Sequence, residues 1–318
     1  MSAALDPSTP PPVGRLAPSP TGQLHLGHAR SFLLAWWSIR SQHGRLLMRM
    51  EDLDTSRVRP GMVDQVLRDL EWLGLDWDGP VVSQSERLPL YRDAIATLES
   101  KDLLYPCTCT RREIQQSQSA PHADDAARPY PGTCRDPQQR DPTRTPAHRF
   151  RVPPTRVQFT DHLHGPVTFD PTTETGDFPV WTREDIPAYQ LAVVVDDAAQ
   201  GITEVLRGDD LLSSTARQLL LQRALALPSP TWIHVPLVVT PEGRRLASRS
   251  DDVPLADLRD TGIDPRAIVA WAARSCAMPA HPLAQPADLL PLFTIESLPR
   301  DPVRLPPDIR DQLAHPAT

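Results

Sequence analysis

The chain has 318 residues, enough to bury a sizeable core and to form two or three modules. Its formal net charge of -7 excludes a protein that binds polyanions over its whole surface, so any such site has to be local. No apolar run reaches the roughly 18 residues needed to span a bilayer, and the first residues lack the order of a signal peptide. Four cysteines in this length do not indicate a disulfide framework, and we expect a cytoplasmic protein without a membrane partner.

Strands and helices alternate in the first hundred residues. Residues 1–14 are rich in proline and predict a flexible tail. The expected strands lie at 13–18 and 45–50, and the expected helices at 28–43, 60–74 and about 88–100. This order predicts an α/β fold with a doubly wound (Rossmann-type) parallel sheet, of which residues 15–104 form the first half.

The composition changes between residues 105 and 185. This stretch is polar and rich in Pro and Asp, and within it 150–169 alternates in the manner of a small antiparallel hairpin. Apolar segments then return, with strands expected at 189–197, 202–208 and 232–239 and a long helix at 211–225. We therefore expect one domain that is interrupted by an insertion and completed by 186–240. A loop with a short helical segment over 241–278 and a loosely packed Pro-rich tail over 279–318 follow.

The stretch LAPSPTGQLHLGHAR (Leu16–Arg30) holds two histidines three residues apart, where a strand is expected to turn into a helix. His25 and His28 have no third ligand nearby, which disfavours a zinc site. Ordinary packing is a second alternative, but it would not need Gly27 between them. Phosphate binding is favoured, because free backbone N–H groups at a helix N-terminus attract an anion and imidazole N–H groups can hold its oxygens.

Cys107, Cys109 and Cys134 form a Cys-x-Cys pair with a distant third cysteine. Three thiolates suit Zn²⁺, and a polar, Pro-rich insertion without a core of its own is the kind of segment that a metal helps to fold. The alternative is three buried thiols in an irregular loop. His122 and His148 are the conventional candidates for a fourth ligand.

Several stretches carry a family resemblance. PSPTGQLHLGH resembles the HIGH signature of class I aminoacyl-tRNA synthetases, in the form of the glutamyl and glutaminyl branch. Further stretches agree in that family's order between about residues 15 and 250: RLAPSPTG, RMEDLDTSR, LEWLGLDWD, AYQLAVVVDD, GITEVLRGDDLL and IHVPLVV. Within the branch the chain is most similar to the glutamyl-Q tRNA(Asp) synthetases, because 250–318 is shorter than the roughly 100 residues of an anticodon-binding domain. The resemblance implies ATP-dependent activation of L-glutamate and its transfer to queuosine in the anticodon of tRNA(Asp), and we expect a monomer.

The resemblance also assigns residues to each part of a nucleotide-binding catalytic domain. The implied glutamate site comprises Arg15, Leu16, Ala17, Pro18, Ser19, Glu51, Tyr189 and Arg207. The guanidinium forks of its two arginines suit carboxylates, and its glutamate suits an ammonium group. The implied site for ATP with Mg²⁺ comprises His25, Gly27, His28, Arg245 and Ser248, with catalytic roles for His25, His28, Arg245 and Arg249. One structural Zn²⁺ is implied at Cys107, Cys109, Tyr130 and Cys134. Asp196 and Asp197, at an expected strand end, are candidates for ribose or tRNA contacts, or for capping the next turn.

The loop TPEGRRLASRS (Thr240–Ser250) departs from the family's KMSKS-like loop, whose lysines stabilise the departing pyrophosphate. Arg245 stands at the first lysine and Ser248 at the second. Lys101 is the only lysine in the chain, so drift from lysine to arginine explains Arg245 but not Ser248. Arg249 is the candidate to supply the missing charge. The alternatives are a truncated or impaired glutamyl-tRNA synthetase-like protein that binds RNA, a zinc-stabilised RNA-binding module, and a nucleotidylyltransferase with another acceptor.

Overall fold

The computed structural model describes residues 10–110, 112–114, 129–246 and 253–316. Within these ranges, no helix combines the length and the apolar character that crossing a bilayer requires. The predicted tail over 1–14 overlaps the first strand, which begins at Val13, and residues 1–9 of it lie outside the described part of the chain.

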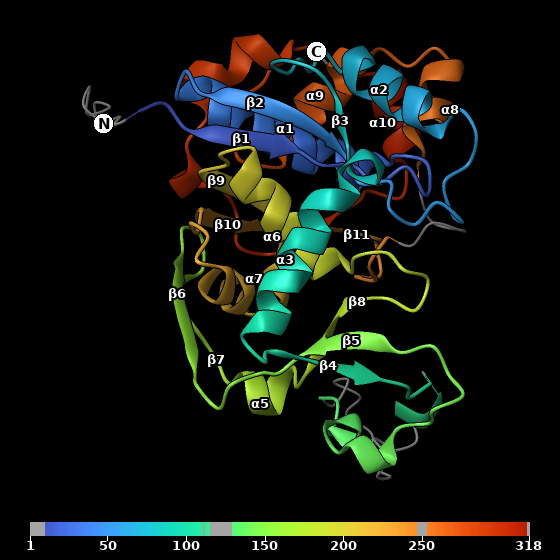
Figure 1. Ribbon diagram of the computed structural model, residues 1–318. Coiled ribbons are helices and arrows are strands. Elements are labelled where there is room, and N and C mark those ends of the chain that lie inside the picture. The colour runs from blue at the N-terminus through green and yellow to red at the C-terminus, as the bar shows by residue number, and fades with distance from the viewer. Residues whose placement is uncertain (1–9, 111, 115–128, 247–252, 317–318) are drawn as a thin grey trace.

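Two sets of parallel strands form the centre of the fold (Figure 1). The first set has the order β1 (Val13–Leu16), β2 (Arg45–Met50) and β3 (Val82–Ser83). The second set has β9 (Glu204–Gly208) beside β10 (Thr231–Val235), in parallel register. The backbone N–H of Thr203 donates to the carbonyl oxygen of Val13 at 2.9 Å, so β9 lies next to β1 and the two sets meet there. The carboxyl ends of β1 and β9 therefore face the same crevice, where open α/β sheets bind ligands.

Helices pack on the strands in two groups. Helix α1 (Leu26–Ser41) covers β1, β2 and β9 and shares its core with α2 (Met62–Trp72). A second core holds α3 (Leu88–Ser100), α6 (Tyr189–Ala199) and α7 (Leu212–Leu225), which lie side by side in Figure 1. Short 3-10 turns connect several elements: η1 (Gln84–Arg87) precedes α3 and η4 (Asp209–Leu211) precedes α7. The doubly wound α/β fold predicted from the alternation is confirmed.

The strand predicted at 189–197 is wrong, because this segment forms helix α6. Every residue from Leu191 to Asp197 is buried, so the helix is enclosed on all sides rather than along one stripe. A helix of that kind has a continuous apolar run in its sequence, and such a run has the same pattern as a buried strand.

The insertion contributes to two sheets. Its own antiparallel sheet has the order β4 (Leu104–Cys107), β5 (Ala147–Phe150) and β8 (Phe178–Trp181), at the end of the molecule opposite β1 and β2 in Figure 1. The insertion also contains the turns η2 (Thr133–Arg135) and η3 (Pro137–Gln139) and the short helix α5 (Pro171–Glu174). The predicted hairpin is confirmed as β6 (Val157–Asp161) and β7 (Gly165–Phe169). Its strand β6 also pairs with β10, so the hairpin extends the central sheet.

The C-terminal segment is packed, and the loosely packed tail predicted over 279–318 is wrong. Helices α8 (Leu255–Asp260) and α9 (Pro265–Arg274) are followed by η5 (Pro286–Leu292), η6 (Ile295–Ser297), β12 (Val303–Arg304) and α10 (Ile309–Ala314). Strand β12 pairs in parallel with β11 (Val238–Val239). Apolar side chains between the prolines enter the core around α1 and α9: Leu289, Phe293, Leu298, Leu305, Ile309 and Leu313. Proline fits 3-10 turns and edge strands, so its frequency does not preclude a packed segment.

Candidate active site

A cavity of about 750 Å³ opens at the carboxyl ends of β1 and β9. It brings together ten of the residues predicted for the glutamate and ATP sites: Arg15, Ala17, Ser19, His25, Gly27, His28, Glu51, Tyr189, Arg207 and Arg245. Leu16 and Pro18 do not line it: the Leu16 side chain is fully buried in the core, and the Pro18 carbonyl accepts the backbone N–H of Glu51 at 2.9 Å. Ser248 and Arg249 lie outside the described residues.

The two histidines of the HIGH-like motif hold the start of α1. The Nδ1 atom of His25 accepts the backbone N–H groups of Gly27 and His28, at 3.1 and 3.4 Å, and the Nδ1 atom of His28 accepts that of His25 at 3.3 Å. Leu26 and Ala29 donate their backbone N–H groups to carbonyl oxygens. The free backbone N–H groups predicted at this helix end are therefore already bonded, and that part of the phosphate argument is wrong. A Cβ on Gly27 would lie 3.0 Å from the His25 ring, so glycine lets the ring fold over the helix start.

The imidazole groups themselves supply the side-chain donors at this helix start. Because each Nδ1 accepts a hydrogen bond, each neutral ring carries its proton on Nε2. His28 lines the cavity, where desolvation by the surrounding walls, with His25 and Arg245 nearby, lowers its pKa well below 6.5. The His28 ring is thus neutral at physiological pH and offers one N–H donor to a phosphate oxygen.

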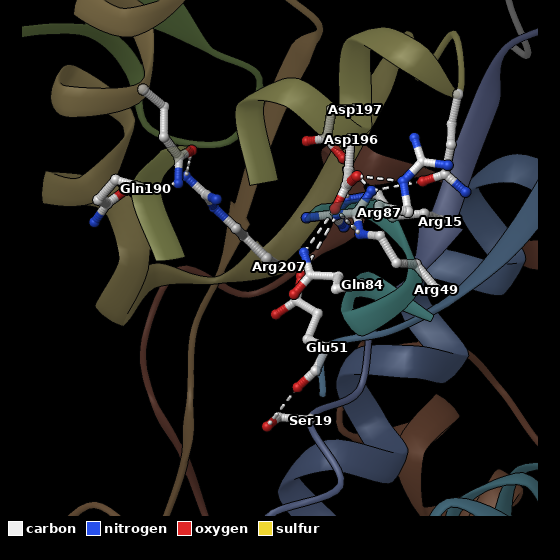
Figure 2. Close-up of polar contacts among 12 residues, drawn as sticks. Arg15, Ser19, Arg49, Glu51, Gln84, Arg87, Gln190, Asp196, Asp197 and Arg207 are labelled. Atoms are coloured by element: carbon white, nitrogen blue, oxygen red, sulfur yellow. Dashed lines mark hydrogen bonds and ion pairs between the residues drawn. The ribbon is translucent and has the colours of Figure 1, made fainter. Parts of the chain in front are cut away.

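Arg15 and Glu51 are held by a network of buried charges (Figure 2). Arg49, fully buried on β2, donates to Asp197 at 2.8 Å and lies 3.5 Å from a Glu51 oxygen, and Arg15 lies 3.6 Å from Asp197. Burial alone would lower the pKa of Arg49, but Asp197, Glu51 and Asp196 together raise it. Burial raises the pKa of Glu51, against the opposing effects of Arg49 and Arg15.

Asp196 and Asp197 do not sit at a strand end, and their predicted roles as ribose, tRNA or turn contacts are wrong. Both lie in α6 and are buried. Asp196 accepts hydrogen bonds from Arg87, Gln84 and Tyr91, at 2.7, 2.7 and 2.8 Å. These contacts tie α6 to η1 and α3, so the network fixes the elements on which the pocket residues stand.

Arg207 occupies the other side of the cavity, at the end of β9. Its Nε donates to the Nε2 atom of His234 at 3.1 Å, and its Nη2 donates to Thr215 and Gln218 at 2.9 and 2.8 Å. Its guanidinium lies over the Trp232 ring, 4.9 Å from the centroid. Tyr189, at the first position of α6, is 37% exposed and lines the same cavity, so its hydroxyl is open to a ligand there.

Arg245 stands at the rim of the cavity, beyond β11. It forms an ion pair with Asp210, which follows β9 and lines the same cavity. Arg245 is therefore the one described cation of the KMSKS-like loop that faces the pocket in common with His28.

The cysteine cluster lies at the other end of the molecule, in the insertion. The sulfurs of Cys107, Cys109 and Cys134 lie within 4.8 Å of one another, and the Tyr130 hydroxyl is 3.5 Å from Cys107 Sγ and 3.4 Å from Cys109 Sγ. A tetrahedral Zn²⁺ with the usual Zn–S and Zn–O lengths places sulfur and oxygen ligands roughly 3.5 Å apart. The four side chains thus fit one metal ion.

The protonation of this cluster also suits a metal. Burial alone would raise the pKa of Cys134, but hydrogen bonds from Thr108, Tyr130 and Cys109 outweigh it and lower the pKa to about 6. Burial raises the pKa of Cys109 to about 11. A pKa of about 6 favours the thiolate of Cys134 at neutral pH, and a metal would release the proton of Cys109 as it binds. His148 lies elsewhere, 3.5 Å from Glu99, and His122 lies outside the described residues.

Sequence reasoning missed the residues that hold the pocket side chains in place: Arg49, Gln84, Arg87, Tyr91, Asp161, Thr215, Gln218 and His234. Arg49 had a signal, since it interrupts the apolar strand RLLMRM two residues before Glu51. Gln218 and Thr215 had none, because polar residues of a helix usually face solvent, whereas those of α7 are largely buried.

Comparisons with known proteins agree with this geometry. The family model for the catalytic domain of class I tRNA synthetases (E and Q) matches residues 13–283. The chain is 48% identical to the glutamyl-Q tRNA(Asp) synthetase of Rhodopirellula baltica, over 84% of this chain and 85% of that one. It is 46% identical to that of Symbiobacterium thermophilum, over 92% and 95%.

Solved structures show the same fold. The crystal structure of glutamate-tRNA synthetase from Elizabethkingia anophelis superposes with a TM-score of 0.77 at 22% identity, covering 95% of this chain and 69% of that one. The match to the family model and the identity to these relatives extend over most of the chain. The chain belongs to the class I tRNA synthetases of the glutamyl and glutaminyl branch and, within it, to the glutamyl-Q tRNA(Asp) synthetase family.

Proposed function

We propose that this chain activates L-glutamate with ATP and transfers the glutamyl group to queuosine in tRNA(Asp). The observation that carries the proposal is the meeting, in one cavity, of two imidazole donors with Arg15, Arg207 and Glu51. Glutamate has two carboxylates and one ammonium group, so two arginines and one carboxylate complement it. The tRNA and its modified nucleoside are inferred from the names of the relatives given above.

The first step is adenylate formation. A carboxylate oxygen of glutamate attacks the α-phosphorus of ATP, the bond to the β-phosphate oxygen breaks, and pyrophosphate leaves. His25 and His28 donate Nε2–H groups to phosphate oxygens, and Arg245 and Arg249 supply cations for the charge that grows on the α-phosphate and pyrophosphate. Mg²⁺ accompanies ATP as its counterion.

Glutamate is oriented by the opposite wall of the cavity. Arg207 and Arg15 take its carboxylates, Glu51 takes its ammonium group, and the Tyr189 hydroxyl donates to one of its oxygens. Ser19 supports this arrangement, since its hydroxyl donates to the Glu51 carbonyl at 3.2 Å. Burial raises the pKa of Glu51, and an ammonium partner favours its charged form.

We further propose that Cys107, Cys109, Cys134 and Tyr130 hold one structural Zn²⁺. The ion cross-links β4 to the turn η2, in a part of the insertion with few apolar side chains. We also infer that the chain acts as a monomer in the cytoplasm. The cavity is formed by residues of one chain, and ATP and tRNA are cytoplasmic substrates.

Two assays test the proposal. Glutamate should support exchange of pyrophosphate into ATP without tRNA, and aspartate should not, because its shorter side chain leaves a buried arginine unpaired. Labelled glutamate should then become attached to tRNA(Asp) that contains queuosine. Unmodified tRNA(Asp) is the matched control, and tRNA(Glu) tests the alternative. Charging of tRNA(Glu) at its 3′ end would replace the proposal with a truncated glutamyl-tRNA synthetase, and absence of exchange would favour an impaired RNA-binding relative.

A further inference from the structure

Arg207 is a buried cation whose described partners are all neutral. Its Nε and Nη2 atoms donate to an imidazole, a hydroxyl, a side-chain amide and, at 3.4 Å, the Leu211 carbonyl. Among the described residues no carboxylate forms an ion pair with it, and its Nη1 atom has no hydrogen-bond partner. Arg15 and Arg49 are different, since both lie near Asp197, at 3.6 and 2.8 Å.

The Nε2 atom of His234 can accept the hydrogen bond from Nε of Arg207 only in the tautomer that carries the proton on Nδ1. The Nδ1 atom of this buried imidazole lies 2.7 Å from an oxygen of Asp161, whose other oxygen accepts the backbone N–H groups of Leu163 and His164. Nδ1 therefore carries the proton, and Nε2 has the lone pair that accepts from Arg207. Burial lowers the pKa of His234, which keeps the ring neutral and free of repulsion toward the guanidinium.

The helix α7 supplies the other two acceptors. Thr215 and Gln218 are 0% and 1% exposed, and both accept from Nη2 of Arg207. Gln218 is held in turn by Gln190, whose amide oxygen accepts from it at 2.9 Å and whose amide nitrogen donates to Ser214 at 3.0 Å. The oriented amide of Gln218 thus fills a position where a carboxylate of the same shape would fit and would neutralise the arginine.

We propose that His234, Thr215 and Gln218 are positioning residues that orient Arg207 without neutralising it, with Asp161 fixing the tautomer of His234. The inference rests on the proposed activation of glutamate. In a buried site a cation that is paired with a protein carboxylate, as Arg15 is with Asp197, binds a substrate carboxylate less strongly than an unpaired cation does, because the two carboxylates compete for it. A cation held by neutral acceptors keeps its charge for the substrate and does not reorganise when the substrate binds. This neutral set of acceptors therefore determines the affinity for glutamate.

The decisive variant is Gln218→Glu. It keeps the size of the side chain and the bond to Arg207, and the Gln190 amide can turn over to donate to the new carboxylate while accepting from Ser214. The KM for glutamate in pyrophosphate exchange should rise about tenfold or more, with little change in the KM for ATP or in the melting temperature. A purely structural role predicts the opposite, because a charge-assisted hydrogen bond holds the arginine at least as well.

A second pair of variants tests the orientation. Thr215→Val removes the hydroxyl acceptor at nearly constant volume and should raise the KM for glutamate several-fold more than it lowers kcat, while Thr215→Ser should restore it. An unchanged KM in Gln218→Glu, with normal exchange by the wild type, overturns this inference alone. Absence of glutamate-dependent exchange in the wild type overturns the proposed function and this inference together.

Discussion

The imidazole of His25 caps the helix that carries His28: its Nδ1 atom accepts the His28 backbone N–H at 3.4 Å, and the two rings stack with centroids 3.7 Å apart. On the proposed function this one side chain combines a cap with a phosphate donor, and two substitutions can separate these roles. His25→Ala should lose both, lowering the free energy of unfolding by about 1 kcal/mol and the rate of pyrophosphate exchange on the order of 10²-fold.

His25→Asn is the matched control for that experiment. Asparagine is among the preferred N-cap residues, so the melting temperature should stay near that of the wild type. Its short amide does not place an N–H where Nε2 lies, so exchange should remain as slow as in His25→Ala. Recovery of activity in His25→Asn would show that His25 acts only on the helix.

The cysteine cluster predicts a metal content. The purified protein should hold about one Zn²⁺, and Cys109→Ser should lose it, as measured by elemental analysis. Tyr130→Phe should lose less metal than any cysteine variant, because a water molecule can take the fourth position on zinc. Cys276 is the fourth cysteine of the chain and lies buried in the other core, so Cys276→Ser should leave the zinc content unchanged. Zinc-free wild-type protein, purified without a chelator, would refute the assignment.

The buried charges around Arg49 predict a large effect on stability. Arg49→Met removes the cation that Asp197, Glu51 and Asp196 share. The free energy of unfolding should fall by about 3–5 kcal/mol, because buried carboxylates then remain unpaired. Arg92 forms an ion pair with Asp185 in which both side chains are mostly exposed, so Arg92→Ala should cost about 0–1 kcal/mol. Denaturation by urea measures both. Similar losses in the two variants would contradict a structural role for the network.

The sequence predicts the residues that line the cavity better than the residues that hold them in place. The HIGH-like stretch, Glu51 and Arg207 could be assigned because spacing along the chain resembles a family, and the structure brings them to one cavity. The supporting residues come together only through tertiary contacts: Asp161 reaches His234 from the inserted hairpin, across 73 positions of sequence. Helix α6 shows the corresponding limit for the fold, since enclosure by neighbours removed the one-sided pattern that distinguishes a helix from a strand.

The pKa of His234 predicts a pH dependence of stability. Burial lowers this pKa, with Arg207 and His164 acting in the same direction and Asp161 opposing them. The unfolded chain takes up the proton near pH 6.5 and the folded chain does not, so this contribution is complete above pH 6.5 and declines as the pH falls. Between pH 6.5 and about 5, above the range where carboxylates titrate, His234→Gln should show a smaller loss of unfolding free energy than the wild type. Urea denaturation at each pH measures the unfolding free energy. If it falls equally with pH in the variant and the wild type, a neutral His234 is refuted.

The ion pair between Arg245 and Asp210 predicts a competition at the rim of the cavity. ATP phosphates have to displace Asp210 in order to reach this arginine, so Asp210→Asn should lower the KM for ATP several-fold. Arg245→Ala should lower the kcat of pyrophosphate exchange on the order of 10²-fold, with little effect on the KM for glutamate, because its charge acts on the phosphates and most strongly on those of the transition state. Arg244 lies next to it, mostly exposed and 3.7 Å from Glu242, so Arg244→Ala controls for loss of any charge in this loop.

The double variant decides whether Asp210 acts through Arg245. If it does, Asp210→Asn should change the KM for ATP much less when Arg245 is already alanine, since residues in direct contact are coupled. If the two effects simply add, Asp210 acts on the phosphates by its own charge and the competition is wrong. A higher KM for ATP in Asp210→Asn would contradict both readings, because the carboxylate would then be assisting ATP rather than occupying the cation that ATP needs.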